Sequence, residues 1–275
     1  MAARTVLRVL LAMDGARPND DVLRAVWSLL EPEQLELTGL YVEDEDLLRA
    51  AGLPCLREIS RSGTESALDS TRLALDMATE VATARRAFDA LAQRLIQEHG
   101  RFGHHFTVAR GRINEVFDRA AADSDFVMVT RAHGGAGPRR RLGRSIVRLA
   151  QQPKHVLFVN EPWASGSSVA VLHDNGPGLR SAARLAAAQE LRLVIVMPVA
   201  ATPPTATNLP ANTTVRQLVR WEEEAIAELC LREDARLLVL PPFPDIDWAE
   251  LLVSLVDRLP CSLLKLAPTP RAPGR

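Results

Sequence analysis

The sequence is nearly without lysine, although it is rich in basic residues. Of its 33 basic residues only Lys154 and Lys265 are lysine, and the others are arginine. This scarcity argues against mechanisms that need a lysine nucleophile, a Schiff base or a P-loop lysine. Both lysines lie beside or within short apolar segments, which indicates structural roles.

Cysteines and long apolar runs are also scarce. Cys55, Cys230 and Cys261 are widely spaced and form no C-x-x-C pair, which excludes a disulfide scaffold, offers no zinc ligand set and fits a reducing compartment. No apolar run approaches the ~20 residues that cross a membrane. Arg8 and Asp14 interrupt the N-terminal apolar stretch, so no secretory segment is predicted. We therefore expect a cytoplasmic protein without a membrane partner.

The charge of the chain is balanced. The 275 residues include 33 basic and 34 acidic side chains, which give a net charge of −1. Such a balance gives no reason to expect a nucleic-acid partner. The composition, 47% hydrophobic and 24% charged, is typical of a globular protein and excludes collagen-like and disordered classes.

Short apolar runs alternate with helical patterns along the whole chain. Val6–Met13 predicts a strand, and a long helix carries an apolar stripe from Val81 to Leu95 before it stops at Gly100. Such alternation predicts an α/β fold with parallel strands and helices on both faces. Further strands are predicted at 35–42, 105–109, 126–130, 156–159, 169–172, 191–199, 237–240 and 262–266, and further helices at 113–122, 144–152, 179–189, 215–231 and 248–259.

The pattern starts again after a linker-like stretch at 161–168. Residues 12–25 resemble residues 172–186, and 151–159 resemble 258–266. This repeat predicts two tandem Rossmann-like domains, 1–160 and 161–275, each with its own parallel sheet. The second copy is shorter, and we expect it to lack one strand–helix element.

The glycine-rich element follows the fourth predicted strand. The first strand ends in Asp14-Gly15 and not in G-x-G-x-x-G, and no Walker sequence occurs, which argues against dinucleotide dehydrogenases and P-loop NTPases. Gly134-x-x-Gly137 and then Gly143-Arg144-Ser145 lead into a helix among several arginines. Small residues and a helix N-terminus favour an anion such as phosphate. A flexible turn with a solvated arginine run explains the same residues equally well.

These pieces resemble the universal stress protein family in its tandem-domain form. The likeness is good over Thr5–Asn160 and holds only in outline over Val169–Ala267. It implies that the N-terminal domain binds an adenine nucleotide, ATP or AMP, with Mg²⁺ as an accompanying ion. The nucleotide-binding residues that it implies are Asp14, Val42, Gly134, Gly137, Gly143 and Ser145.

Two departures from the family pattern stand out. Five residues separate Gly137 from Gly143, where the family has nine. The second copy keeps an aspartate, Asp174, but has no glycine loop after Leu240. We therefore expect nucleotide binding only in the first domain. Because stress-protein domains commonly pair through their last strands, we expect 156–159 and 263–266 to meet in an internal pseudo-dimer, and a homodimer is a further arrangement.

Other sequence features give only weak evidence for a metal site, a lid over a ligand or a catalytic site. His104 and His105 are adjacent on a strand and therefore point to opposite faces, so with His133 they predict no metal site. The acidic run 43–46 indicates a solvated turn more than a Mg²⁺ site. The apolar segment Leu47–Ile59 is compatible with core packing and with a lid over a ligand. No Ser-His-Asp or Cys-His pattern has a supporting signature, so no catalytic residue is predicted.

Three functions follow. The first is a regulatory stress-response protein that binds an adenine nucleotide without fast turnover and acts on an unidentified protein partner. The second is a nucleotide-free scaffold. The third is an enzyme, either a slow ATPase or an adenylate transferase. Asp14 and the two glycines of the loop favour the first over the second, and the missing base, nucleophile and lysine argue against the third.

Overall fold

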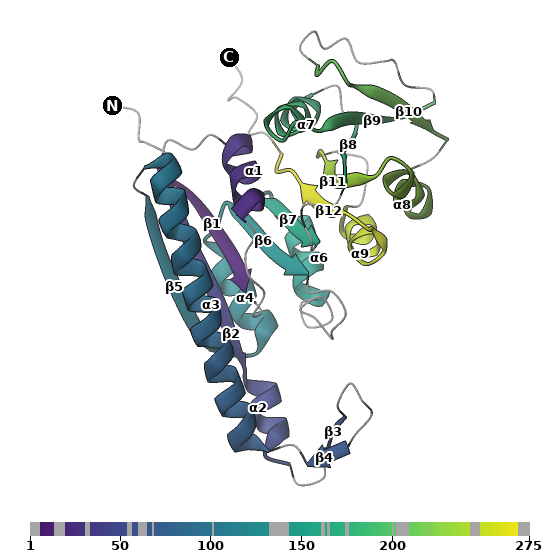
Figure 1. Cartoon of the computed structure of the whole chain (residues 1–275). Coiled ribbons are helices and arrows are strands. Elements are labelled where there is room, and N and C mark those ends of the chain that lie inside the picture. Colours follow the sequence, from purple (N-terminus) through teal and green to yellow (C-terminus); the bar gives the residue numbers. More distant parts are fainter. Residues whose placement is uncertain are drawn as a thin grey trace, which may run out of the picture.

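The computed structural model describes residues 6–13, 20–30, 34–53, 57–59, 65–67, 69–100, 102–131, 143–160, 163, 166–173, 176–199, 201, 209–219, 221–242 and 248–268. Within these residues the strands form a ten-stranded main sheet and a small two-stranded sheet, and helices cover both faces of the main sheet (Figure 1). The predicted α/β class is confirmed.

The first half of the main sheet is parallel and has the order β5-β2-β1-β6-β7. Its strands are β1 (Val6–Met13), β2 (Gln34–Asp44), β5 (Gly103–Gly111), β6 (Phe126–Arg131) and β7 (His155–Asn160). One face carries α1 (Asp20–Leu30) and α3 (Ser70–His99), and the other carries α4 (Ile113–Ala122) and α6 (Gly143–Gln151). Apolar side chains that alternate along the strands fill both layers, and Phe88 of α3 is completely buried.

The second half repeats this topology with the order β10-β9-β8-β11-β12. Its elements are β8 (Ser168–Leu172), α7 (Pro177–Ala188), β9 (Arg192–Pro198), β10 (Thr214–Leu218), α8 (Glu223–Arg232), β11 (Ala235–Leu240), α9 (Trp248–Arg258) and β12 (Ser262–Lys265). The strand registers and the sequence repeat make β1 equivalent to β8, β2 to β9, and β5 to β10.

The prediction for residues 215–231 is wrong in its first part. Residues 214–218 form β10, which pairs with β9, and the helix α8 begins only at Glu223. The side chains of this strand alternate between half-buried and exposed, which is the period of a strand. The second half therefore has all five strands. What differs is the connection of β9 to β10, which spans 199–213 and holds no helix in its described part.

The two half-sheets join through their last strands. β12 pairs with β7 in antiparallel register, with Leu263 opposite Phe158 and Leu264 opposite Leu157. The predicted pairing of these strands is confirmed. The expectation of a separate sheet in each half is wrong, because this pairing makes one continuous sheet. Short apolar edges leave backbone groups and side chains unpaired, and joining them covers both edges at once. The domain boundary at 160/161 stays a prediction.

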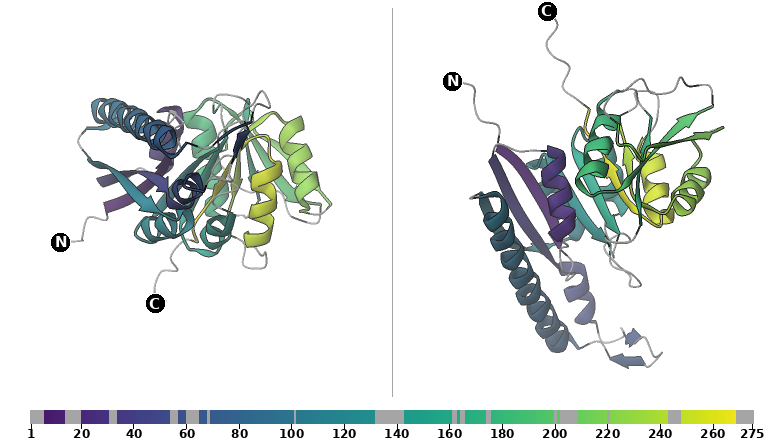
Figure 2. Two further views of the ribbon diagram at one scale, coloured as in Figure 1. Left: turned by 90° about the horizontal axis from the view of Figure 1, so that it is seen from below. Right: turned by 45° about the horizontal axis from the view of Figure 1, so that its top comes forward.

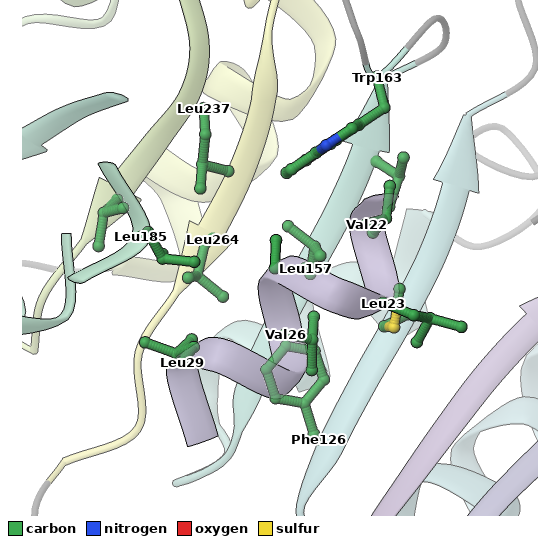
Figure 3. Packing of buried hydrophobic residues seen from close by; sticks show 14 of the residues in the cluster. Val22, Leu23, Val26, Leu29, Phe126, Leu157, Trp163, Leu185, Leu237 and Leu264 are labelled. Carbon is green, nitrogen blue, oxygen red and sulfur yellow. The ribbon is translucent and has the colours of Figure 1, made fainter. Parts of the chain in front are cut away.

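Equivalent helices also meet across this junction. α1 contacts α7 on one face of the sheet, and α6 contacts α9 on the other. The guanidinium group of Arg184 in α7 donates a hydrogen bond to the carbonyl of Leu29 at the end of α1, at 2.8 Å. Figure 3 shows Trp163 in one buried cluster with Leu157 of β7 and Leu237 of β11. Contacts between equivalent elements are those of a two-fold pairing, here inside one chain.

Both lysines have structural roles, as predicted, because each ammonium group donates hydrogen bonds to carbonyl oxygens at the end of a helix. Buried Lys154 donates to the carbonyl oxygens of Ala121 and Ser124 at the end of α4. Buried Lys265 reaches from β12 to the carbonyl oxygens of Leu149 and Gln152 at the end of α6, at 3.2 and 2.6 Å. Burial, with the nearby Lys154 ammonium, lowers the pKa of Lys265 to about 8. A cation is favourable at a helix C-terminus, and these bonds satisfy carbonyls that the helices leave free.

A long arm projects from the first half between β2 and β5 (Figure 2). Asp69 caps α3 by accepting a hydrogen bond from the amide of Thr71, and the helix stops at Gly100, whose φ of 85° suits glycine. The arm also contains α2 (Glu45–Ala51), which packs on α3, and the hairpin β3 (Arg57–Ile59) and β4 (Glu65–Ala67). Within the segment Leu47–Ile59, residues 47–51 of α2 thus lie beside α3, whereas residues 57–59 pair with β4.

Candidate functional site

The strand order of the first half reverses between β1 and β6. From β1 the chain proceeds to β2 and β5 on one side, and later returns to β6 and β7 on the other. β1 and β6 are direct parallel neighbours, with Leu11 opposite Met128 and Ala12 opposite Val129. In open α/β sheets ligands bind beyond the carboxyl ends of the strands at such a reversal.

Three of the predicted site residues are described, and two of them open a helix at this edge. Gly143 is the first residue of α6, and Ser145 lies in its first turn with no exposed surface. Val42 lies near the end of β2, one residue beyond Tyr41, which is opposite the last residue of β1, Met13. The strand ends and the start of α6 therefore bring these three residues to the same edge of the sheet.

The remaining predicted residues lie outside the described residues. These are Asp14, Gly134 and Gly137, and the same holds for His133 and for most of the arginines in the loop. Asp14 directly follows β1, and the loop follows β6 and precedes α6. The strands that precede these residues in the chain, β1 and β6, are the two strands at the reversal.

Asn114 joins the predicted residues through a hydrogen bond. The hydroxyl of Ser145 donates to the side-chain oxygen of Asn114 at 3.1 Å. Asn114 lies in the first turn of α4, so this bond ties the starts of α4 and α6 together. Both helix N-termini carry partial positive charge, which favours an anion at this edge. Sequence reasoning missed Asn114, although its position just after β5, where the chain leaves the same edge, was a usable signal.

The same edge of the second half has a different composition. His173 follows β8 and is 5% exposed, and neither ring nitrogen has a hydrogen-bond partner within the described part of the chain. Its backbone amide donates to the carbonyl of Val196 at 2.8 Å. β11 is followed by Pro241 and Pro242, where the first half has its glycine-rich loop. Asp174 lies outside the described residues.

The histidines and the acidic run have structural partners. His105 lies within hydrogen-bond distance of the Thr38 hydroxyl, 3.2 Å, whereas His104 packs against aromatic rings on the opposite face, as predicted. Glu43 pairs with Arg110 at 3.2 Å. Neighbouring members of the run cap α2 or pair with other arginines. Among the described residues no group of three or more histidine, cysteine or acidic side chains could hold a metal ion.

The described cysteines are poor nucleophiles. Cys230 and Cys261 are both buried. A hydrogen bond with Cys261 and burial raise the pKa of the Cys230 thiol well above its ordinary value. A thiol that stays protonated does not act as a nucleophile at neutral pH.

Within the described part of the chain, no helix is long and apolar enough to cross a membrane.

Comparisons with known proteins assign the fold. No family model matches the sequence, and no curated protein matches it. The chain is similar in structure to a universal stress protein from Archaeoglobus fulgidus DSM 4304, with a TM-score of 0.56, 13% identity and coverage of 96% of this chain and 97% of that one. It is also similar to a functionally unknown protein from Pseudomonas aeruginosa PAO1, with a TM-score of 0.53, 13% identity and coverage of 97% and 93%. The chain therefore has a fold like that of universal stress proteins.

Proposed function

We propose that the first half binds an adenine nucleotide, ATP or AMP, at the carboxyl edge between β1 and β6. The observation that carries this proposal is the direct pairing of β1 with β6 at the reversal of strand order, with the start of α6 at the same edge. The residues that would bind are Asp14, Val42, Gly134, Gly137, Gly143 and Ser145.

The chemistry of these residues suits a nucleotide. A carboxylate after β1 accepts hydrogen bonds from ribose hydroxyls, and backbone groups near Val42 suit the edge of a base. The starts of α4 and α6, tied by the Ser145–Asn114 bond, and the glycines between β6 and α6 favour phosphate. Mg²⁺ would accompany ATP through the phosphates.

Binding without fast turnover makes the protein a regulator in a stress response and not an enzyme. No catalytic residue is proposed, because neither the sequence pattern nor the described part of the site offers a base or a nucleophile beside the phosphate-binding elements. The nucleotide would then set which surfaces a protein partner meets. A cytoplasmic location fits this role.

A nucleotide-free scaffold is the second candidate. Two observations favour it: the hydroxyl of Ser145 is already bonded to Asn114, and the loop between Gly137 and Gly143 is short. In this case the internal pseudo-dimer would present surfaces to a partner without a nucleotide.

Titration calorimetry of the full chain with ATP and with AMP distinguishes the two. We expect wild type to bind one of them with a dissociation constant on the order of micromolar, and Gly137→Val to bind at least about tenfold more weakly, because a β-branched side chain blocks backbone contacts to phosphate. Gly103→Val is the matched control, since a Cβ there has no neighbour closer than 3.7 Å.

Mass analysis of the denatured protein for carried-over nucleotide complements the titration. Absence of binding by wild type would favour the scaffold. Equal binding by wild type and Gly137→Val would show that the loop is not the site.

A further inference from the structure

A second candidate site lies at the opposite, amino edge of the first half. A groove of ≈ 420 Å³ opens on the face of the sheet that carries α4. Its floor includes Leu10 and Leu40, and its walls are polar: Glu36 and Thr107 on the strands, and Asp123 at the end of α4. The volume falls within the ~300–1,000 Å³ that small-molecule sites span.

The second half shows what the equivalent position contains there. Glu233 ends α8 as Asp123 ends α4, each being the residue directly after its helix. The carboxylate of Glu233 accepts hydrogen bonds from Arg192 of β9 at 3.0 Å and from Arg216 of β10 at 2.6 Å. The Glu233 side chain is 5% exposed. Two guanidinium groups therefore fill this position in the second half.

The first half has the acid without these arginines. The strand registers place Glu36 at the position of Arg192, and Thr107 at the position of Arg216. The Asp123 side chain is exposed at the groove and makes no hydrogen bond or ion pair within the described part of the chain. Burial lowers the pKa of the Lys154 ammonium, which donates to the carbonyl oxygens of Ala121 and Ser124, and the charge of Asp123 is near enough to raise it in part. Arg8 is the one guanidinium group among the groove residues, and it lies 3.7 Å from Glu36. Among the groove residues, two carboxylates, Glu36 and Asp123, thus share one guanidinium group, where Glu233 of the second half alone has two.

We propose that this groove binds a small molecule that carries a guanidinium group. The planar fork of a guanidinium suits two hydrogen bonds to a carboxylate, here that of Asp123. In the second half, Arg192 and Arg216 each donate one hydrogen bond to the carboxylate of Glu233. Its remaining N–H groups meet the hydroxyl of Thr107, and an alkyl chain lies on the apolar floor. The groove is at the amino ends of β1 and β2, away from the proposed nucleotide site at their carboxyl ends, so this inference is independent of that proposal.

Calorimetry of the full chain with agmatine, at low ionic strength, tests the proposal. We expect agmatine to bind, and to bind more tightly than putrescine, which carries an ammonium group in place of the guanidinium. Asp123→Asn and Glu36→Gln are each expected to weaken agmatine binding about tenfold or more, because each removes a charged acceptor. Glu115→Gln is the matched control, since this exposed acid on α4 pairs with Arg112 outside the groove.

A fourth variant supplies the missing cation within the chain. Thr107→Arg places a guanidinium group where the second half has Arg216, and we expect it to abolish agmatine binding while ATP binding stays as in wild type. The proposal is overturned if wild type does not bind agmatine, if putrescine binds as tightly, or if Asp123→Asn and Thr107→Arg bind agmatine like wild type.

Discussion

In the first half residues 45–102, which include α2, the β3–β4 hairpin and the 30-residue helix α3, connect β2 to β5, whereas residues 199–213 alone connect the equivalent strands β9 and β10 in the second half. The strand order is nevertheless the same in both halves, and both end in a strand that pairs across the junction. The buried strands and the junction therefore specify the fold, while the connections at the sheet edges are free to differ.

The strongest contrast inside the core is between Gly39 and Ile195, which occupy equivalent positions on β2 and β9. A Cβ at Gly39 would lie 2.6 Å from Phe88 of α3 and 2.8 Å from Phe106, so the glycine makes room for two aromatic rings. Ile195 is completely buried where the second half has no equivalent of α3 within its described residues.

Exchanging these residues should destabilise each half. We expect Ile195→Gly to cost about 4 kcal/mol through the cavity and the loss of strand propensity. Gly39→Ile should cost about 3 kcal/mol by overpacking against Phe88. Urea unfolding measures both changes in the free energy of unfolding. Gly52→Ala, where the nearest atom to a Cβ is at 3.4 Å, is the control. A neutral Gly39→Ile would mean that α3 does not pack on β2 as described.

We expect acid to destabilise the protein through His155, which lies on β7 at the junction of the two half-sheets. Burial and the ammonium of Lys265 lower the pKa of His155 to about 4, against about 6.5 in an unfolded chain. The unfolded state therefore takes up the proton first as the pH falls. The free energy of unfolding is therefore unaffected by His155 above about pH 6.5. It falls between about pH 6.5 and pH 4, by about 2 kcal/mol after allowance for partial solvent contact.

The matched variant is His155→Ser, because the second half has Ser262 at the equivalent position. We expect unfolding free energies measured from pH 7 to pH 4 to show a smaller slope in His155→Ser than in wild type. Equal slopes would assign the acid sensitivity to other groups.

Glu233 and Asp123 form a matched pair of acids at equivalent helix ends. Glu233→Gln should cost about 2 kcal/mol, since it leaves two arginines without their carboxylate, although both are partly exposed to solvent. Asp123→Asn should change stability by less than about 0.5 kcal/mol. Thermal or urea unfolding of both variants measures the difference, and equal costs would contradict the contrast drawn between the two positions.

The arginines also set a pH dependence for Glu233. Hydrogen bonding by Arg216, supported by the charges of Arg216 and Arg192, lowers the pKa of Glu233. Its contribution to stability is therefore present above the pKa of an unfolded glutamate, about 4.3, and is lost as the pH falls through the lower folded value. Glu233→Gln should remove this part of the acid response.

Local patterns predicted most of the fold. The bounds of β1 and α4 follow from their periodicity, and the pairing of β7 with β12 follows from two short apolar edges and the family resemblance. The strand β10 was mistaken for the start of a helix, because five residues before a true helix carry too little periodicity to separate the two. The sequence repeat alone predicts two separate sheets and gives no strand order, whereas the structure joins all ten strands in one sheet.

Long-range contacts were beyond sequence reasoning. The Ser145–Asn114 bond joins residues 31 positions apart, and Lys265 reaches the carbonyl of Leu149 across 116 positions. Such contacts depend on how helices settle on the sheet, and no local pattern encodes them. The groove was missed for the same reason, because its residues come from three strands and a helix end.

The assignment of nucleotide binding to the first half alone is tested most directly by calorimetry of ATP and AMP binding to wild type, Asp14→Ala and Asp174→Ala. These aspartates follow the equivalent strands β1 and β8. We expect one nucleotide to bind per chain, Asp174→Ala to bind like wild type, and Asp14→Ala to bind at least about tenfold more weakly, through loss of a charged hydrogen-bond acceptor. Two nucleotides per chain, or a loss of affinity in Asp174→Ala equal to that in Asp14→Ala, would contradict the assignment of nucleotide binding to the first half.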